Sequence, residues 1–360
     1  MYDKQINDWG EHVQRVKTSE EFINKIYAVQ ILMAIVIVFA HGATFTHVQA
    51  SGGLDFLALR FFDDLLAFTA AALSVFMTIS SFLLFYNYDA QKASSKIRGR
   101  LMRNLIPYFA WNTLGILYTH PSFHGIGDVV SWYLLSKGCP AFWFLEMVTV
   151  LALLAPVNSF IFKNKKISIL LLIVIGIWTF VIQPDFRIFS FLSDEAARYI
   201  NRCWSYVYAY ALGIVLALHF RDFVLQKAYG KGANVLGRLV VLYLLFAPYN
   251  AIYRFLAMHA FLFIWIAKDG TYYKQKHWYQ TMSFFLYASH PLGLSLVRRV
   301  FNVLHLDYLI ADVPVSGMYA LFWRTVLSSI TIVICLGVGF LLRKYIPFIY
   351  DIAVGNRKTK

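Results

Sequence analysis

The stretch QILMAIVIVFAHGATF, residues 30–45, decides the fold class of this chain. Together with its flanks it forms an apolar run over 26–48, and a membrane-spanning helix needs about 20 mostly apolar residues. Two of its residues are polar: Gln30 at the start, and His41, which we expect to lie deep inside the span. Polar side chains are costly in lipid and are usually kept for a partner or a function, so both are candidate site residues.

Helical geometry places Gln30 and His41 on the same face of this span. The two residues are eleven positions apart, which makes about three turns and separates the two side chains by about 16 Å along the axis. Both could simply make hydrogen bonds between helices. The imidazole of His41 also titrates near neutral pH, which suits it to proton transfer.

The composition of the whole chain is that of a polytopic membrane protein. Of its 360 residues, 59% are hydrophobic and 14% are charged, whereas soluble proteins are about half apolar and about a quarter charged. We therefore predict an all-α, polytopic transmembrane helix bundle of about ten spans, because helices satisfy their own backbone hydrogen bonds in lipid. The predicted spans are residues 26–48, 62–88, 102–119, 141–162, 167–183, 203–219, 235–249, 252–267, 281–298 and 318–342.

The charge distribution orients these spans. Most of the 33 lysines and arginines fall in segments that face the cytoplasm if both termini lie inside, as the positive-inside rule requires. This predicts a multi-pass protein of the cytoplasmic membrane, with a cytoplasmic N-terminal segment 1–25, a transmembrane domain 26–345 and a cytoplasmic C-terminal tail 346–360. Orientation and lipid headgroups account for the net charge of +14, so nucleic-acid binding is not expected.

The cysteines do not indicate a metal site. Cys139, Cys203 and Cys335 lack metal-ligand spacing, so no metal is expected. A disulfide between Cys139 and Cys203 requires that both face outward. The sequence does not indicate an oligomeric state.

Basic residues lie just before and at the start of the third predicted span, in SSKIRGRLMRNLIPYFAW, residues 94–111. Arg100 and Arg103 are three residues apart and are therefore neighbours on a helix, and Arg98 precedes them. Guanidinium groups bind phosphates through two parallel hydrogen bonds, which predicts a phosphate site. The alternative is ordinary cytoplasmic charge that reaches toward lipid headgroups.

Further polar residues lie inside or beside later spans. Glu146, in FWFLEMVTVLALLAP (142–156), needs a partner or a proton, so it is either half of a structural pair or catalytic. Tyr287 and His290 share a helix face, and Pro291 is expected to kink that helix. Asp63 and Asp64 open the second span, where carboxylates also serve as helix-dipole partners.

The order of these segments resembles the acyltransferase-3 family of integral-membrane acyltransferases. That family typically shows Arg, ten residues and His in its first span, then a phenylalanine-rich stretch ending in Ser-Gly-Phe, a basic loop with Arg-x-x-Arg, Trp-Phe-Leu, and Tyr-x-x-His. The match runs from about residue 22 to 345. This chain shows His41, VFMTISSFLLF (75–85), Arg100 and Arg103 with Pro107, WFL (143–145), and Tyr287 with His290.

The chain departs from the family pattern at two positions. Gln30 stands where the family usually has arginine, so any positive charge needed there must come from elsewhere. Ser81 stands where the family usually has glycine, which is expected to loosen close packing.

The resemblance implies O-acyl transfer, usually O-acetyl transfer, from cytoplasmic acyl-CoA to a hydroxyl of a glycan or another acceptor handled at the membrane. On this interpretation acetyl-CoA is the donor substrate, His41 is the general base and Glu146 is a second catalytic candidate. The donor would be bound by Arg98, Arg100, Arg103 and Gln30. The acceptor would be bound by Tyr287, His290, Trp143 and Asp64.

Two other classes of protein remain as alternatives. In a proton-coupled transporter or flippase, His41, Glu146 and His290 would line the proton path, but no internal repeat is evident. In a polyprenol-dependent glycosyltransferase, Asp63 and Asp64 would form the acidic motif. That class usually has long outer loops, whereas the predicted outer segments of this chain are short. The sequence identifies neither the acceptor nor the acyl chain.

Overall fold

The protein is almost entirely helical in the part that the computed structural model describes. That part comprises residues 2–42, 48–49, 72–86, 88–182, 203–204, 206–225, 259, 278–310 and 315–355, with side chains described from Phe22 onward. The all-α class is confirmed there, apart from a two-residue parallel pairing of β1 (Val48–Gln49) with β2 (Val315–Ser316). The span predicted at 235–249 and the residues Asp63 and Asp64 lie outside the described residues, and of the span predicted at 252–267 only His259 is described.

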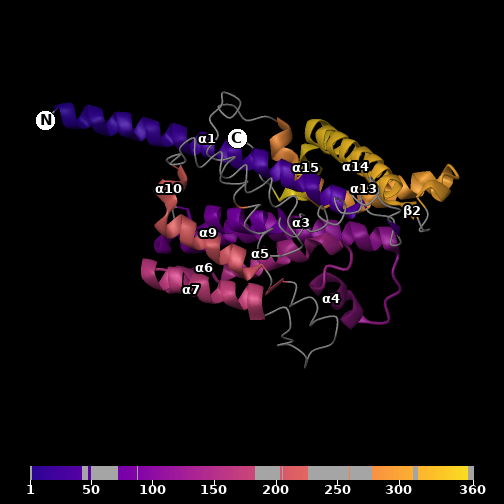
Figure 1. Ribbon diagram of the computed structural model, residues 1–360, viewed down its shortest axis with the longest axis horizontal. Coiled ribbons are helices and arrows are strands. Elements are labelled where there is room, and N and C mark those ends of the chain that lie inside the picture. The colour runs from indigo at the N-terminus through magenta and orange to yellow at the C-terminus, as the bar shows by residue number, and fades with distance from the viewer. Residues whose placement is uncertain are drawn as a thin grey trace.

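The helices follow most of the other predicted spans in order (Figure 1). The helices are α1 (Tyr2–His41), the helix Ala72–Phe85, α3 (Ala93–Thr119), α4 (Ile126–Leu134), α5 (Trp143–Leu153), α6 (Ala155–Ile161), α7 (Lys165–Ile177), α9 (Val207–His219), α10 (Arg221–Leu225), α13 (Ser283–Val303), α14 (Gly317–Tyr345) and α15 (Pro347–Val354). The 3₁₀ turns are η1 (Ala90–Lys92), η2 (Pro140–Phe142), η6 (Trp278–Met282) and η7 (Asp307–Leu309), and η3 (Trp178–Ile182) is a π-helical turn.

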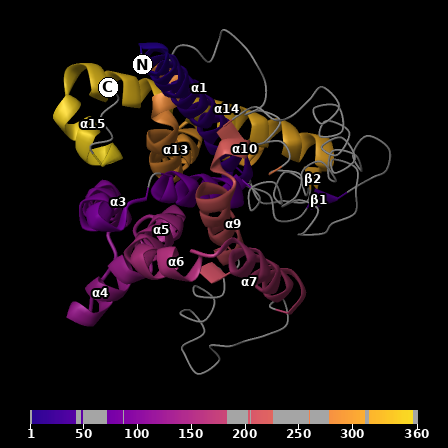
Figure 2. The same ribbon diagram turned by 90° about the vertical axis from the view of Figure 1, so that its left-hand side faces the viewer.

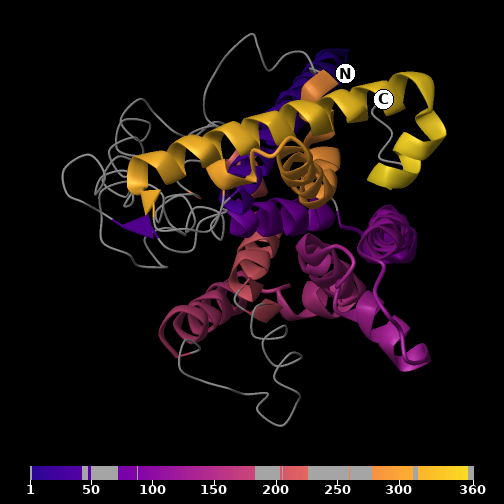
Figure 3. The same ribbon diagram turned by 90° about the vertical axis from the view of Figure 1, so that its right-hand side faces the viewer.

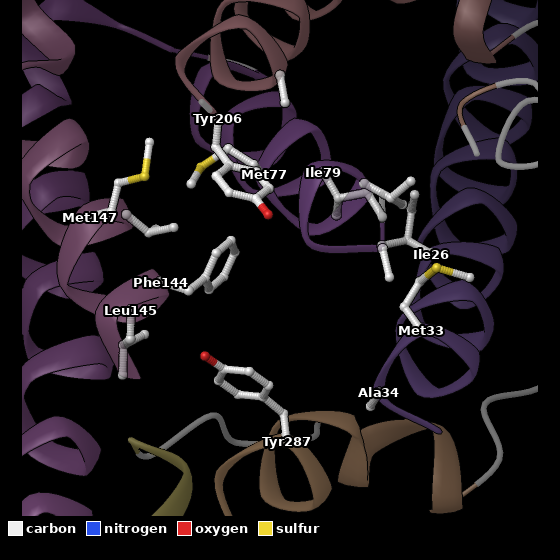
Figure 4. Close-up of a cluster of buried hydrophobic side chains, with 14 of the residues drawn as sticks. Ile26, Met33, Ala34, Met77, Ile79, Phe144, Leu145, Met147, Tyr206 and Tyr287 are labelled. Carbon is white, nitrogen blue, oxygen red and sulfur yellow. The ribbon is translucent and has the colours of Figure 1, made fainter. Parts of the chain in front are cut away.

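The helices form two groups that meet along a buried aromatic and aliphatic core. Helix α13 packs against both α1 and α14, whereas α5 packs against α3 and α7 against α9 (Figures 2 and 3). The helix Ala72–Phe85 contributes Met77 and Ile79 to this core (Figure 4). Ile26 of α1 lies on one side of these two residues and Phe144 of α5 on the other.

Several helices are suited to a membrane. Among the described residues, Phe22–His41 and α14 are long and apolar enough to cross it, and a third span results if Pro140–Leu153 and Ala155–Ile161 are counted together. These two segments meet at 62°, because Pro156 has no N–H and cannot continue the helical hydrogen bonding. The outer face of α7 exposes a row of large apolar side chains, as expected for a helix surrounded by lipid. The count of ten spans and the cytoplasmic termini stay predictions.

The structure corrects the expected position of His41 within the first span. Helix α1 ends at His41, seven residues before the predicted limit, so His41 is the last helical residue and not a residue deep inside a span. The segment 346–360, predicted as a C-terminal tail, contains α15, which packs against α3.

The structure also corrects the expectation that Ser81 loosens helix packing. Ser81 is fully buried, and its hydroxyl donates to the carbonyl groups of Met77 and Thr78, both at 3.1 Å. The space for this hydroxyl comes from Gly213 of α9, where a Cβ would lie 1.9 Å from Ser81 Oγ. The glycine that allows close packing therefore stands on the opposite helix.

Candidate functional site

A cavity of about 500 Å³ lies between α1, the helix Ala72–Phe85, α3, α5 and the start of α13. It brings together four residues singled out in the sequence, from three different helices. The lining consists of Tyr27, Gln30, Phe76, Ser80, Leu83, Arg100, Arg103, Asn104, Phe144, Leu145, Val148, Thr281, Ser283, Phe284 and Tyr287. One part of the wall is therefore polar and basic, and another part is aromatic and aliphatic.

Two arginines give the cavity its positive charge. The Nη2 of Arg100 donates to the Ser80 carbonyl at 2.6 Å, and the Nε of Arg103 donates to the Gly99 carbonyl at 2.8 Å. Burial, followed by the nearby Arg103 guanidinium, lowers the pKa of Arg100 to about 10, so it is still charged at neutral pH. An anion in the cavity would relieve the repulsion between the two groups. Arg98 is exposed and does not line the cavity.

Two further basic residues, Lys96 and Arg343, lie close to the cavity that Arg100 and Arg103 line. Burial, followed by the charge of Arg100, lowers the pKa of Lys96, which precedes the predicted span. Arg343, near the end of α14, donates from Nη1 to the hydroxyl of Thr281 at 2.9 Å, and Thr281 lines the cavity. Arg343 is not among the site residues expected from the sequence. Its contact with the cavity wall adds to the positive charge there.

The aromatic part of the cavity is organised around Tyr287. Its ring stacks on Phe142 with centroids 6.0 Å apart and meets Phe144 edge-on at 6.2 Å. Figure 4 shows Tyr287 projecting from α13 toward Phe144 of α5. The Tyr287 hydroxyl donates to the Ala141 carbonyl, which satisfies its polar end and fixes the ring at the cavity wall.

A pair of histidines lies beyond Tyr287. The ring centroids of Tyr287 and His290 are 6.1 Å apart, and those of His290 and His41 are 5.1 Å apart. His290 is buried, and its Nδ1 lies 2.6 Å from the Tyr287 carbonyl, which can only accept a hydrogen bond. Nδ1 of His290 therefore carries the proton, which leaves Nε2 as an acceptor. His41, at the exposed end of α1, completes the pair.

A comparison with known families gives this arrangement a context. The sequence profile of a family described as an acyltransferase domain, Acyl_transf_3, matches residues 23–342. The chain belongs to the acyltransferase-3 family. No curated protein and no solved structure gives a significant match. The matched region includes the whole cavity lining, both histidines and most of α14, whereas α15 follows it.

One buried residue of this acyltransferase was missed in the sequence analysis. Arg324 of α14 is completely buried, and its guanidinium donates from Nε to the Phe39 carbonyl at 2.5 Å and from Nη2 to the Ala40 carbonyl. The last carbonyl groups of a helix lack intrahelical partners and carry partial negative charge, so a guanidinium is well matched to them. Arg324 therefore holds the end of α1, next to His41. As a charged residue within an apolar span, it could have been recognised from the sequence.

Two further predicted site residues, Glu146 and Trp143, are described and do not line the cavity. Glu146 accepts a hydrogen bond from the hydroxyl of Ser136 at 3.2 Å, and Ser136 also lies 3.1 Å from the hydroxyl of Tyr108. Trp143 is buried and packs against Tyr206 with centroids 5.3 Å apart.

The described region contains all three cysteines. All three cysteines are free thiols, so the disulfide considered between Cys139 and Cys203 is not formed. Among the described residues, no group of three or more His, Cys, Asp or Glu side chains is placed to hold a metal ion.

Proposed function

We propose that this membrane acyltransferase transfers an acyl group, typically acetyl, from cytoplasmic acyl-CoA to a hydroxyl of a glycan or another acceptor handled at the cytoplasmic membrane. The observation that carries the proposal is the single cavity that joins Arg100 and Arg103 to Gln30 and Tyr287. A CoA thioester combines phosphates, a flexible arm with two amides, and a reactive carbonyl. The cavity offers guanidinium groups, a side-chain amide and an apolar wall for these parts.

Donor binding follows from the chemistry of the lining. Arg103 and Arg100 bind CoA phosphates, because guanidinium forms strong charge-assisted hydrogen bonds to phosphate oxygens. The Gln30 side chain, half-buried on α1, bonds the amides of the arm. In this account the positive charge that the family usually places at position 30 comes from the two arginines of α3 in the same cavity.

The chemical step takes place beyond Tyr287. The acyl thioester passes the Tyr287 ring and reaches the histidine pair, where His41 accepts the proton of the acceptor hydroxyl. As this oxygen attacks the thioester carbonyl, the C–S bond breaks, and the CoA thiolate leaves and takes a proton from the His41 imidazolium. His290 packs against His41 and holds its ring in place.

The reaction can be tested with the purified full-length protein. Incubation with labelled acetyl-CoA and cell-envelope extract is expected to release CoA thiol and to transfer the label to an extract component that mass spectrometry identifies by its acetyl mass increment. A protein that moves solutes or lipids but leaves acetyl-CoA intact under all these conditions would contradict the proposed reaction.

Arg103→Ala and Arg100→Ala are expected to weaken acetyl-CoA binding by about 10- to 100-fold, the value of one charge-assisted hydrogen bond. The rate at saturating donor should change less, because phosphate contacts are remote from the thioester. Lysine replacements should remain impaired, because they lack the planar fork of guanidinium. Arg98→Ala is the matched control, since Arg98 is on the same helix but does not line the cavity. If all three alanine variants bind acetyl-CoA as tightly as the unchanged protein does, Arg100 and Arg103 do not belong to the donor site.

Gln30→Arg restores the residue usual in the family. The longer side chain can enter the cavity that Gln30 lines, so we expect the variant to insert normally and to keep or raise its affinity for acetyl-CoA. Its melting temperature and donor affinity are measured together. If Gln30 instead packs tightly against another helix, the larger residue should cost about 1–3 kcal/mol of stability. Such a loss without a gain in affinity would show that Gln30 is a structural amide.

A further inference from the structure

Helix α15, beyond the region matched by the acyltransferase family, is fixed onto the helix that carries the cavity arginines. Its residues Tyr350, Ala353 and Val354 are buried. The indole Nε1 of Trp111, on α3, donates to the Ala353 carbonyl at 2.9 Å, while the ring of Tyr350 stacks on Phe285 of α13 at 5.6 Å. Figure 2 shows α15 folded back beside α3. Helix α15 thus contacts both α3, which bears Arg103, and α13, which bears Tyr287.

The residue that follows α15, Gly355, packs closely against the backbone of Arg103 on α3. Gly355 ends α15 in the left-handed conformation, with φ of 70°. A Cβ on Gly355 would lie 2.0 Å from the carbonyl oxygen of Arg103 and 2.7 Å from its carbonyl carbon. Both the backbone angle and the lack of space therefore require glycine. The atoms in contact belong to the two backbones, so a change of side-chain rotamer cannot make room for a Cβ.

We infer that α15 positions Arg103 at the donor cavity and that Gly355 is the contact through which it acts. The inference rests on the proposed donor site. The Arg103 side chain is exposed and is tied to its own helix through the Gly99 carbonyl, so the position of its backbone determines where the guanidinium enters the cavity. Gly355 lies against that backbone at Arg103, where even a Cβ has no room. It is thus a positioning residue, because it touches Arg103 and does not line the cavity.

Gly355→Ala tests this inference in the full-length protein. The added methyl group must push α15 away from Arg103, so we expect acetyl-CoA binding to weaken about tenfold, with little change in the rate at saturating donor. Gly337→Ala is the control, because a Cβ at Gly337 meets nothing within 4 Å. Trp111→Phe provides a milder variant: it removes the hydrogen bond to Ala353 but keeps an aromatic ring, and should weaken binding in the same direction.

A double-mutant cycle separates positioning from general loss of stability. If Gly355 acts through Arg103, then Gly355→Ala should have no further effect on donor affinity in an Arg103→Ala background. Additive effects, or a lower melting temperature with unchanged affinity, would overturn the inference and make α15 a structural element only. Unchanged affinity in Arg103→Ala alone would instead overturn the donor site, which distinguishes failure of the proposed function from failure of the α15 contact.

Discussion

His41→Ala is expected to lower the rate of acyl transfer by about 10²- to 10⁴-fold, the usual contribution of a general base. Acetyl-CoA affinity and melting temperature should stay close to those of the unchanged protein, because His41 is exposed at the end of α1 and does not line the cavity. Single-turnover transfer with purified protein measures the loss directly. His124→Ala, which removes an exposed imidazole after α3, is the control.

The same measurement on His290 decides between the two imidazoles. If His41→Ala keeps most of the rate while His290→Gln abolishes it, His290 is the base and the assigned roles are reversed. If neither variant loses activity, the chemical step takes place away from the histidine pair.

Arg324→Leu is expected to have the largest effect on stability. It removes the donors to the carbonyl oxygens of Phe39 and Ala40, and each carbonyl left unsatisfied costs about 1–3 kcal/mol, so the free energy of unfolding should fall by about 2–6 kcal/mol. Transfer should also slow, because the end of α1 no longer holds His41 beside His290. Unfolding in mixed micelles and the transfer rate report the two effects.

Two further variants calibrate the result for Arg324. Arg324→Lys keeps the charge but not the fork that reaches both carbonyls, so it should recover only part of the stability. Arg299→Leu removes an exposed guanidinium from α13 and should change stability by less than about 1 kcal/mol. An Arg324→Leu protein that unfolds and reacts like the unchanged one would show that Arg324 does not hold α1.

The sequence predicted the helical class and the main members of the cavity, because both depend on local patterns. Arg100 and Arg103 are close on any helix, and Gln30 and Tyr287 were assigned to the site through the ordered motifs of the family. The structure places all four around one cavity. The sequence did not separate Arg98 from its two neighbours, since the helical phase alone does not say which face meets a cavity.

The remaining features depend on contacts between distant parts of the chain. Apolar character continues past His41, so hydropathy could not place the end of α1, where Arg324 takes up the last carbonyl groups. The pairing of Ser81 with Gly213 and the contact of Gly355 with Arg103 likewise join residues more than a hundred positions apart. Glu146 looked like a lone carboxyl group within a span, and its hydrogen bond to Ser136 requires the loop after α4 to fold back.

The most direct test of the donor site is an experimental structure of the purified acyltransferase with a non-hydrolysable thioether analogue of acetyl-CoA. We expect the analogue to occupy the cavity, with phosphate oxygens within hydrogen-bond distance of Arg100 and Arg103, the arm beside Gln30 and the sulfur next to Tyr287. An analogue bound outside this cavity, or within it but with its phosphates away from both arginines, would contradict the proposed donor site.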